Sequence, residues 1–166
     1  MNIIFTRPLI DAEDLMTNFF SSNYKVIHLP TLSINSANME PINTKEFDGL
    51  IFTSANAVRF LQLKNDEKNI KCFCVGNITE RSLRLKGFTN TVAASGTVNA
   101  LKNIILNSEK KIKNLAYLCG DVVSYDLDKD LKLSGFKVKK IINYTSSKIT
   151  DPVSYTHLRA HETAQY

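Results

Sequence analysis

Residues 50–60 read LIFTSANAVRF, and residues 73–88 read FCVGNITERSLRLKGF. In each stretch an apolar run typical of a buried strand ends at small polar residues, and a helical pattern follows. Such units predict parallel strands whose carboxyl ends meet at one edge of a sheet. Open α/β sheets bind ligands at this edge, and helix N-termini there favour anions. The two stretches therefore predict an α/β fold with a ligand site at the sheet edge.

A regular alternation of strands and helices extends outward from these two units. The expected strands are Gly49–Thr53, Lys71–Val75, Thr91–Ala93, Leu115–Leu118 and Lys137–Ile142, and the expected helices lie near 55–64, 78–86, 97–108 and 123–134. Gly87 and Gly135 follow expected helices at positions that suit a left-handed C-cap. Short connections and right-handed crossovers predict a flavodoxin-like, doubly wound parallel sheet of about five strands.

The start of the chain carries the same pattern on a smaller scale. Asn2–Thr6 and Lys25–Leu29 are expected strands, and Ile10–Phe20 between them is an expected helix. The motif IIFTRP at 3–8 is similar to LIFTSA at 50–55, which indicates two related domains, the first of them interrupted. A lone strand–helix–strand piece of about 30 residues cannot bury its own apolar faces, so we expect its missing partners beyond residue 150.

These patterns divide the chain into five segments. Residues 1–31 begin a discontinuous first domain, 32–47 form a linker, 48–142 form a complete second domain, 143–151 form a return linker, and 152–166 form a tail. The tail, PVSYTHLRAHETAQY, resembles the translated read-through of an adapter and is left out of the fold prediction. It holds His157 and His161, whose i, i+4 spacing could place two ligands on one helix face, but the His-Glu-x-x-His order of zinc proteases is absent.

Cysteine usage and hydropathy limit the classes of protein that fit. Cys72, Cys74 and Cys119 lie in apolar strand contexts and lack the Cys-x-x-Cys spacing of zinc and redox sites. We therefore expect reduced thiols in a cytoplasmic protein, and no metal site. No apolar stretch approaches the length of a membrane span, and the first residues predict a strand instead of a signal peptide.

The net charge of +5 leaves two interpretations open. The basic runs KKIK at 110–113 and KVKK at 137–140 suit solvated helix and strand ends, and they also suit a polyanionic ligand. No interleaving of aromatic and basic residues supports nucleic-acid binding. The chain also lacks the glycine-rich motifs of dinucleotide and nucleotide triphosphate sites and any Ser-His-Asp or Cys-His set in its body.

Four loops follow the expected strands of the complete domain with small polar residues. The loops are Thr53-Ser54-Ala55-Asn56, Gly76-Asn77-Ile78-Thr79, Ala94-Ser95-Gly96-Thr97 and Cys119-Gly120-Asp121. Helix capping accounts for Ser54, Thr79 and Thr97 one at a time. Together the loops predict a rim of hydrogen-bond donors suited to carboxylates or phosphates, with glycines that allow close approach of the backbone.

An ordered series of motifs resembles the uroporphyrinogen-III synthase family. The motifs are FTRP at 5–8, IFTSANAV at 51–58, VGNIT at 75–79, LRLKGF at 83–88, LCGD at 118–121 and IINYT at 141–145. Each is weak alone, but their order over residues 1–147 is specific. The family has two α/β domains joined by two strand-like linkers, with the active cleft between them. The resemblance implies that this chain is truncated at its C-terminal side, so we expect little or no activity.

The resemblance also implies a reaction and a set of site residues. The family converts hydroxymethylbilane to uroporphyrinogen III, losing water and inverting the last pyrrole ring, without a metal or organic cofactor. Its substrate is a linear tetrapyrrole with eight carboxylates. By resemblance Tyr144 assists departure of the hydroxyl group. The expected substrate-binding residues are Thr6, Arg7, Thr53, Ser54, Gly76, Asn77, Thr79, Ser95, Gly96, Thr97 and Gly120.

Two other classes remain open from the sequence. One is a free-standing, non-catalytic anion-binding or regulatory α/β module, which would have no need of the N-terminal strand–helix–strand piece. The other is a basic nucleic-acid-binding domain. The synthase interpretation further implies a monomer in tetrapyrrole biosynthesis with a small-molecule substrate, no nucleic-acid partner and no membrane partner.

Overall fold

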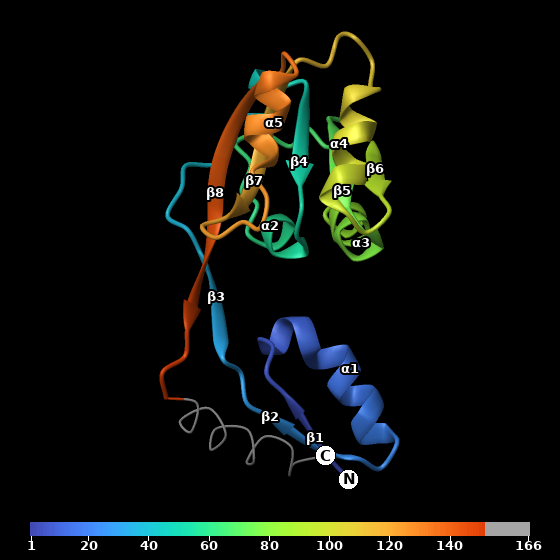
Figure 1. Cartoon of the computed structure of the whole chain (residues 1–166), viewed down its shortest axis with the longest axis vertical. Coiled ribbons are helices and arrows are strands. Elements are labelled where there is room, and N and C mark those ends of the chain that lie inside the picture. Colours follow the sequence, from blue (N-terminus) through green and yellow to red (C-terminus); the bar gives the residue numbers. More distant parts are fainter. Residues whose placement is uncertain (152–166) are drawn as a thin grey trace. The chain divides into compact units, whose positions relative to one another are not determined.

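A computed structural model describes residues 1–151, and these divide into two units (Figure 1). Among the described residues, unit 1 comprises Met1–Asn35 and 146–151, and unit 2 comprises Ser36–Thr145. The predicted tail, 152–166, with His157 and His161, lies outside the described residues. The finer division into five segments stays a prediction. Within residues 1–151, no helix combines the length and the apolar character needed to cross a membrane.

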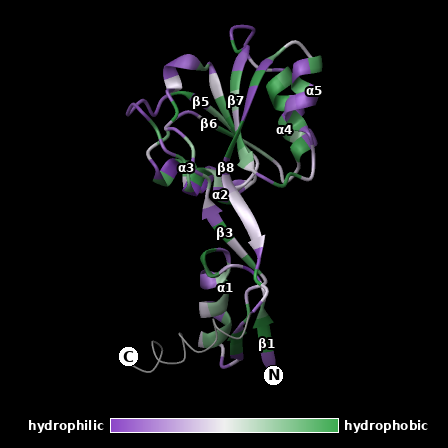
Figure 2. Cartoon of the chain, turned by 90° about the vertical axis from the view of Figure 1, so that its left-hand side faces the viewer, coloured by the Kyte–Doolittle hydropathy of each residue, from purple (hydrophilic) through white to green (hydrophobic). Residues whose placement is uncertain are grey.

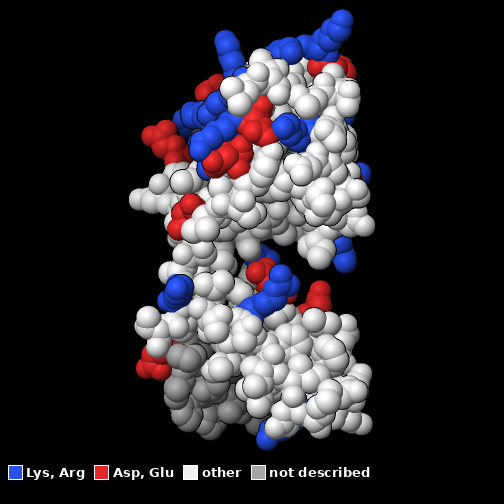
Figure 3. Space-filling model, in the orientation of Figure 1, with Lys and Arg blue, Asp and Glu red and all other residues white. Residues whose placement is uncertain are grey.

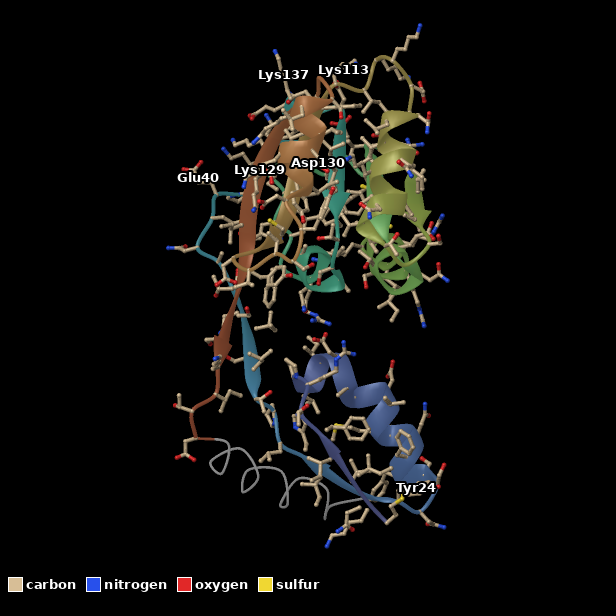
Figure 4. All side chains as sticks on the ribbon, in the orientation of Figure 1. Tyr24, Glu40, Lys113, Lys129, Asp130 and Lys137 are labelled. Atoms are coloured by element: carbon tan, nitrogen blue, oxygen red, sulfur yellow. The ribbon has the colours of Figure 1, made fainter. Side chains whose placement is uncertain are left out.

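Unit 1 contains one parallel strand pair and one helix. Strands β1 (Asn2–Phe5) and β2 (Lys25–His28) pair with Asn2 opposite Lys25, and α1 (Leu9–Ser21) connects them. The aromatic rings of Phe5, Phe19 and Tyr24 pack together, with centroids 5.9 Å and 5.7 Å apart along the series (Tyr24 is labelled in Figure 4). Asn23 turns the chain out of α1 with a φ of 62°, a left-handed geometry that asparagine tolerates.

The apolar residues of unit 1 are only partly covered by its own elements. Ile4 neighbours the buried Phe5 and points to the opposite face of the strand pair, where it is 58% exposed. Phe20 on α1 is 70% exposed. A strand pair with one helix covers one face at most, so the described part of this unit has a small core.

Unit 2 is built on a parallel sheet with helices on both faces. Its strands are β4 (Gly49–Phe52), β5 (Lys71–Val75), β6 (Thr91–Ala94), β7 (Asn114–Gly120) and β8 (Lys137–Lys148), of which β8 extends past Thr145 into unit 1. Its helices are α2 (Ala55–Arg59), α3 (Asn77–Leu85), α4 (Val98–Leu106) and α5 (Leu127–Leu133), with a 3-10 turn, η1 (Thr44–Glu46). The predicted doubly wound parallel sheet is confirmed. Gly87 and Gly135 have positive φ values of 91° and 90° after α3 and α5, as predicted.

The strand order of this sheet is β3-β8-β7-β4-β5-β6, where β3 is Leu32–Ser36. Numbered in chain order from β4, the five strands of unit 2 run 5-4-1-2-3, whereas flavodoxin itself has the order 2-1-3-4-5. The chain leaves β4 first toward β5 and β6 and then returns to pair β7 on the other side of β4. The order therefore reverses between β4 and β7, and doubly wound sheets bind ligands beyond the strand ends at this point.

Successive residues of the strands supply two separate cores. Ile51, Phe73 and Tyr117 face α4 and α5, while Leu50 and Phe52 face α2 and α3. In Figure 2, α4 and α5 lie on one side of the sheet and α3 lies on the other. Because both faces are buried, the strands are almost uniformly apolar instead of alternating. This burial explains why unbroken apolar runs correctly predicted the strands.

Two helices are shorter than the sequence pattern predicts. The helix expected at 55–64 ends at Arg59, because the following residues pair with the linker: Ile42 and Leu63 form a parallel bridge. The amide of Ile42 donates to Gln62 O (2.9 Å), and the amide of Lys64 donates to Ile42 O (2.8 Å). The helix expected from 123 begins at Leu127, after the turn in which the Leu127 amide donates to Tyr125 O (3.0 Å). Helical periodicity does not register these tertiary pairings.

Candidate functional site

The loops that the sequence singled out follow the carboxyl ends of the parallel strands of unit 2. Figure 1 shows β4 running toward the end of the sheet where α2 begins. Thr53 and Ser54 follow β4, Gly76 follows β5, Ser95 follows β6, and Gly120 ends β7. Parallel pairing places these ends at one edge of the sheet, as predicted.

At this edge the ring of Tyr144 lies against the backbone of Gly120. A Cβ atom added to Gly120 would lie 2.7 Å from Cε2 and Cζ of Tyr144 and 3.0 Å from its hydroxyl oxygen. Real Cβ atoms do not approach other atoms so closely, so the phenol ring occupies the space that any side chain at position 120 would need. Gly120 is a glycine because the ring of Tyr144 lies against its backbone.

A β-bulge in β8 aims Tyr144 at Gly120. Cys119 pairs with Ile142, whereas the next residue, Gly120, pairs with Tyr144, so Asn143 is the extra residue of the bulge. The Asp121 amide donates to Tyr144 O (3.2 Å), which fixes the backbone beyond the bulge. Bulges commonly redirect side chains next to functional sites.

Phe60 also packs against the Tyr144 ring. The two rings are stacked, with centroids 6.4 Å apart and an interplanar angle of 28°. Phe60 is the C-cap residue of α2, so the position where α2 ends decides where this ring lies. Tyr144 is therefore held by the backbone of Gly120 and by the ring of Phe60, with part of its surface exposed.

Asn143 anchors the bulge in the core. Its Nδ2 donates to Ala57 O at 2.7 Å, its side chain is fully buried, and its backbone oxygen accepts from the Ala37 amide at 3.1 Å. Among the described residues, its Oδ1 is one of two buried side-chain oxygens without a hydrogen-bond partner. Because a buried acceptor without a partner costs free energy, the bond to α2 offsets part of the cost of placing Asn143 here.

A second tyrosine joins the loop after β4 to the core. Tyr117 is 2% exposed, and its hydroxyl lies 3.1 Å from the hydroxyl of Thr53. Burial raises the pKa of Tyr117 to about 12, although the hydrogen bond to Thr53 opposes the rise. The Tyr117 phenol is therefore neutral at physiological pH and fixes the hydroxyl of Thr53.

The other rim residues cap helices, pack toward the sheet or are exposed. Ser54 caps α2 by accepting from the Asn56 amide (3.2 Å), and Thr97 caps α4 by accepting from the Ala100 amide (3.1 Å). Gly76 caps α3 with a φ of 79°, which favours glycine. Thr79 is buried on the same side of α3 as Leu83, so its side chain faces the sheet. Four rim residues are exposed: Asn77, Ser95, Gly96 and Thr97.

Thr6 and Arg7 belong to unit 1, at the carboxyl end of β1. The backbone oxygen of Arg7 lies 2.9 Å from Nε2 of His28, and the backbone oxygen of Thr6 accepts from the Thr31 amide at 3.0 Å. These bonds fix the backbone and leave both side chains exposed. The other ten predicted site residues lie in unit 2, and the structure brings Gly120 and Tyr144 into contact.

Nothing within residues 1–151 gathers three or more His, Cys, Asp or Glu residues into a possible metal site. Two larger pockets of unit 2, of about 510 and 600 Å³, are lined by other residues: the first by residues between 61 and 68 together with Lys86, the second by residues at the amino ends of the strands. The candidate site is therefore an open edge that holds a positioned phenol and a rim of N–H and O–H groups.

The sequence model of the family described as Uroporphyrinogen-III synthase HemD matches residues 14–163. The chain belongs to this family. Comparison with curated proteins gave no match.

Solved synthases have the same fold. The uroporphyrinogen-III synthetase of Helicobacter pylori 26695 is similar with a TM-score of 0.59 and 20% identity over 93% of this chain and 66% of that chain. A mutant uroporphyrinogen-III synthase of the extremely thermophilic bacterium Thermus thermophilus gives a TM-score of 0.59 and 15% identity over 99% of this chain and 69% of that chain. The chain thus spans about two thirds of the length of these synthases, and the low identities limit the likeness to the fold.

Sequence reasoning missed three residues around the family's tyrosine motif. Phe60 was assigned to the interior of a longer helix, Tyr117 to an ordinary core strand, and Asn143 to a linker. A signal was available for Asn143, because a polar residue between the apolar Ile142 and the aromatic Tyr144 interrupts the strand pattern. For Phe60 and Tyr117 no such signal exists, since each touches a residue more than sixty positions away.

Proposed function

We propose that the chain carries a large part of a uroporphyrinogen-III synthase, a carbon–oxygen hydro-lyase that cyclises hydroxymethylbilane with loss of water and inversion of ring D. The observation that carries the proposal is the contact of Tyr144 with Gly120, at the sheet edge where the strand order reverses, in a member of this family. Ligands of doubly wound sheets bind at this point.

Tyr144 assists the departure of the hydroxyl group in this proposal. Its phenol can donate a proton to the leaving oxygen, which departs as water and leaves a carbocation on the substrate. Attack on this cation by a carbon of the last pyrrole ring gives a spiro intermediate, whose rearrangement inverts that ring. The proton released when the macrocycle closes restores the phenol. Gly120 and Phe60 act by positioning the phenol, since both contact its ring.

The rim binds the carboxylates of the substrate. The first N–H groups of α3 and α4 have no intrahelical acceptor and lie at positive helix ends, which suits anions. The capping oxygens of Ser54 and Thr97 accept from helix amides, so their hydroxyl protons remain available to a carboxylate. From unit 1, Arg7 supplies an exposed guanidinium, which binds carboxylates through two parallel hydrogen bonds.

The 166-residue chain on its own has low turnover in this proposal. The described part of unit 1 has two strands and one helix, with Ile4 and Phe20 largely exposed. The reaction needs a rigidly held substrate, and misplacement by about 1 Å can cost on the order of a hundredfold in rate.

The test combines binding and turnover. The chain is titrated with hydroxymethylbilane, and backbone amide shifts are expected at Ser54, Asn77, Thr97 and Gly120. Turnover is followed by separating the product with an inverted ring from the product without one. The source DNA is sequenced through codon 151, and turnover is compared between this chain and the longer polypeptide that the DNA encodes. A Tyr144→Phe variant keeps the stacked ring, so it is expected to bind normally, and in the longer polypeptide its turnover is expected to fall by about 10²-fold or more.

Two outcomes would overturn parts of this proposal. Normal turnover by Tyr144→Phe would remove the phenol from the reaction. Binding at the rim without turnover by the longer polypeptide would favour a non-catalytic anion-binding module.

A further inference from the structure

Basic side chains gather in a pocket of unit 2 that shares no residue with the rim of the candidate site. A pocket of about 510 Å³ is formed by the connection between α2 and β5 and by the C-cap of α3. Leu61 and Leu63 supply its apolar lining, and Lys64, Lys68 and Lys86 supply three ammonium groups against the single carboxylate of Asp66. We call it the lysine pocket, and its lining carries a net positive charge.

Lys86 is held in place by backbone oxygens. Its Nζ donates to Arg59 O at 3.1 Å and to Leu61 O at 3.5 Å. Carbonyl oxygens orient an ammonium group but leave its charge uncancelled. Burial, and after it the charge of Lys68, lowers the pKa of Lys86, and both lysines line the same pocket.

Lys68 is positioned by an aromatic ring. Its Nζ lies 4.9 Å from the centroid of the Phe88 ring, which is buried, and its side chain is 30% exposed. A cation over an aromatic face is oriented and still keeps its positive charge. The carboxylate of Asp66 lies 4.0 Å from Nζ of Lys68 and is fully exposed.

The acidic residues around the pocket do not neutralise it. Lys64 lies 3.9 Å from Glu40, but their side chains are 55% and 93% exposed, and Figure 4 shows Glu40 projecting away from the ribbon. Exposed ion pairs of this kind are worth little and are screened by salt. By contrast, on the face of unit 2 drawn in Figure 3, basic and acidic side chains are interspersed. Unit 2 also contains short ion pairs, such as Lys129 with Asp126 and Lys132 with Asp128.

We propose that the lysine pocket binds a small multivalent anion, bearing two or more carboxylate or phosphate groups, at a site separate from the candidate catalytic edge. None of its lining residues belongs to the rim, and neither Gly120 nor Phe60 lines it. The anion bridges Lys68 and Lys86 and relieves their repulsion, while Lys64 supplies a more mobile third contact. The hydrocarbon floor of Leu61 and Leu63 accommodates the carbon or ester part of the ligand.

The experiment uses the whole 166-residue chain and two probes, citrate and inorganic pyrophosphate. Calorimetric titration gives the affinity, and amide shifts locate the site. Saturable binding is expected, with shifts at 61–68 and at Lys86, and a stronger response to one probe identifies whether carboxylate or phosphate is preferred. Lys68→Gln and Lys86→Gln are each expected to weaken binding by about tenfold or more, since hydrogen bonds to charged groups are lost.

Lys111→Gln is the matched control. It removes the same charge at a site 78% exposed and outside the pocket, so affinity should change by less than about twofold. The thermal midpoint of each variant shows whether it folds. If a variant does not fold, the amide shifts of the unsubstituted chain on titration show whether the anion binds in the lysine pocket. Absence of saturable binding, or equal weakening by all three variants, would overturn the proposal. Shifts confined to Ser54, Thr97 and Gly120 would place the anion at the catalytic edge, overturning the pocket while supporting the proposed function.

Discussion

Replacing Gly120 by alanine tests whether Tyr144 is positioned by backbone contact. The added Cβ would lie 2.7 Å from two carbon atoms of the ring, whereas carbon atoms in contact are about 3.5–4.0 Å apart. The ring must therefore move by about 1 Å or the bulge in β8 must shift. Gly120 is absent from the glycines with positive φ, so alanine meets no backbone strain there.

The expected loss of stability is the balance of two effects. Overpacking in a well-packed region costs about 1–3 kcal/mol. Alanine also reduces the conformational entropy of the unfolded chain, which stabilises the fold by about 0.4–1 kcal/mol. We therefore expect Gly120→Ala to lower the free energy of unfolding by about 1–2 kcal/mol. In a Tyr144→Ala background the clash is gone, so the same substitution should be neutral or stabilising.

Urea unfolding of the four chains of this double-mutant cycle measures the coupling between positions 120 and 144. The ring signals of Tyr144 in NMR spectra should move in Gly120→Ala. Gly49→Ala is the matched control, because its Cβ would lie 3.0 Å from Cδ2 of Leu115 in the same sheet, and its three nearest neighbours do not include Tyr144. It should destabilise the chain without moving those signals. Zero coupling between 120 and 144, with unmoved ring signals, would refute the close contact.

Three further predictions concern stability and reactivity. The amides of Lys113 (2.9 Å) and Asn114 (2.7 Å) donate to the Asp48 carboxylate and hold its pKa below the usual range. The ionised carboxylate therefore stabilises the folded chain above the unfolded pKa of about 3.9, and this stabilisation is lost as pH falls through the lower folded pKa. Asp48→Ala should therefore cost about 1 kcal/mol in urea unfolding at neutral pH, and a difference that stays constant into acid would contradict this account. Asn143→Ala should cost about 2 kcal/mol at any pH, because Ala57 O loses its buried donor; an unchanged melting temperature would argue against the anchor. Burial raises the pKa of the thiol to about 12 in Cys72 and to about 11 in Cys74 and Cys119. A disulfide reagent at mildly alkaline pH should therefore label these thiols only after the chain unfolds. Rapid labelling of the native chain would count against their burial.

The fold class could be predicted because its signals are local. Leu50, Ile51 and Phe52 are all apolar, since one face of β4 packs on α2 and α3 and the other on α4 and α5. Each strand end is marked by a residue that stops the apolar run, and helix starts carry capping residues such as Ser54 and Thr97. These choices depend on neighbours within a few positions, so a single sequence records them.

The strand order and the end of α2 were not predictable in the same way. The sequence does not record whether β7 pairs with β4 or with β6, because each of these strands is largely apolar on both faces. Whether α2 continues past Arg59 depends on the bridge between Ile42 and Leu63, two residues that lie 21 positions apart. Such pairings compete with helical propensity and outweigh it when they bury apolar side chains.

The sequence alone was enough to predict the doubly wound class, the loops that carry polar residues and the family to which the motifs are similar. The contact of Gly120 with Tyr144, the stacking of Phe60 on the same ring and the meeting of Thr53 with Tyr117 across 64 positions became visible in the folded chain. A side chain's neighbours across a sheet depend on strand order and on the register shift of one bulge. A one-residue shift redirects a side chain to the other face, so chemistry at the edge is set by pairing over long separations in the chain.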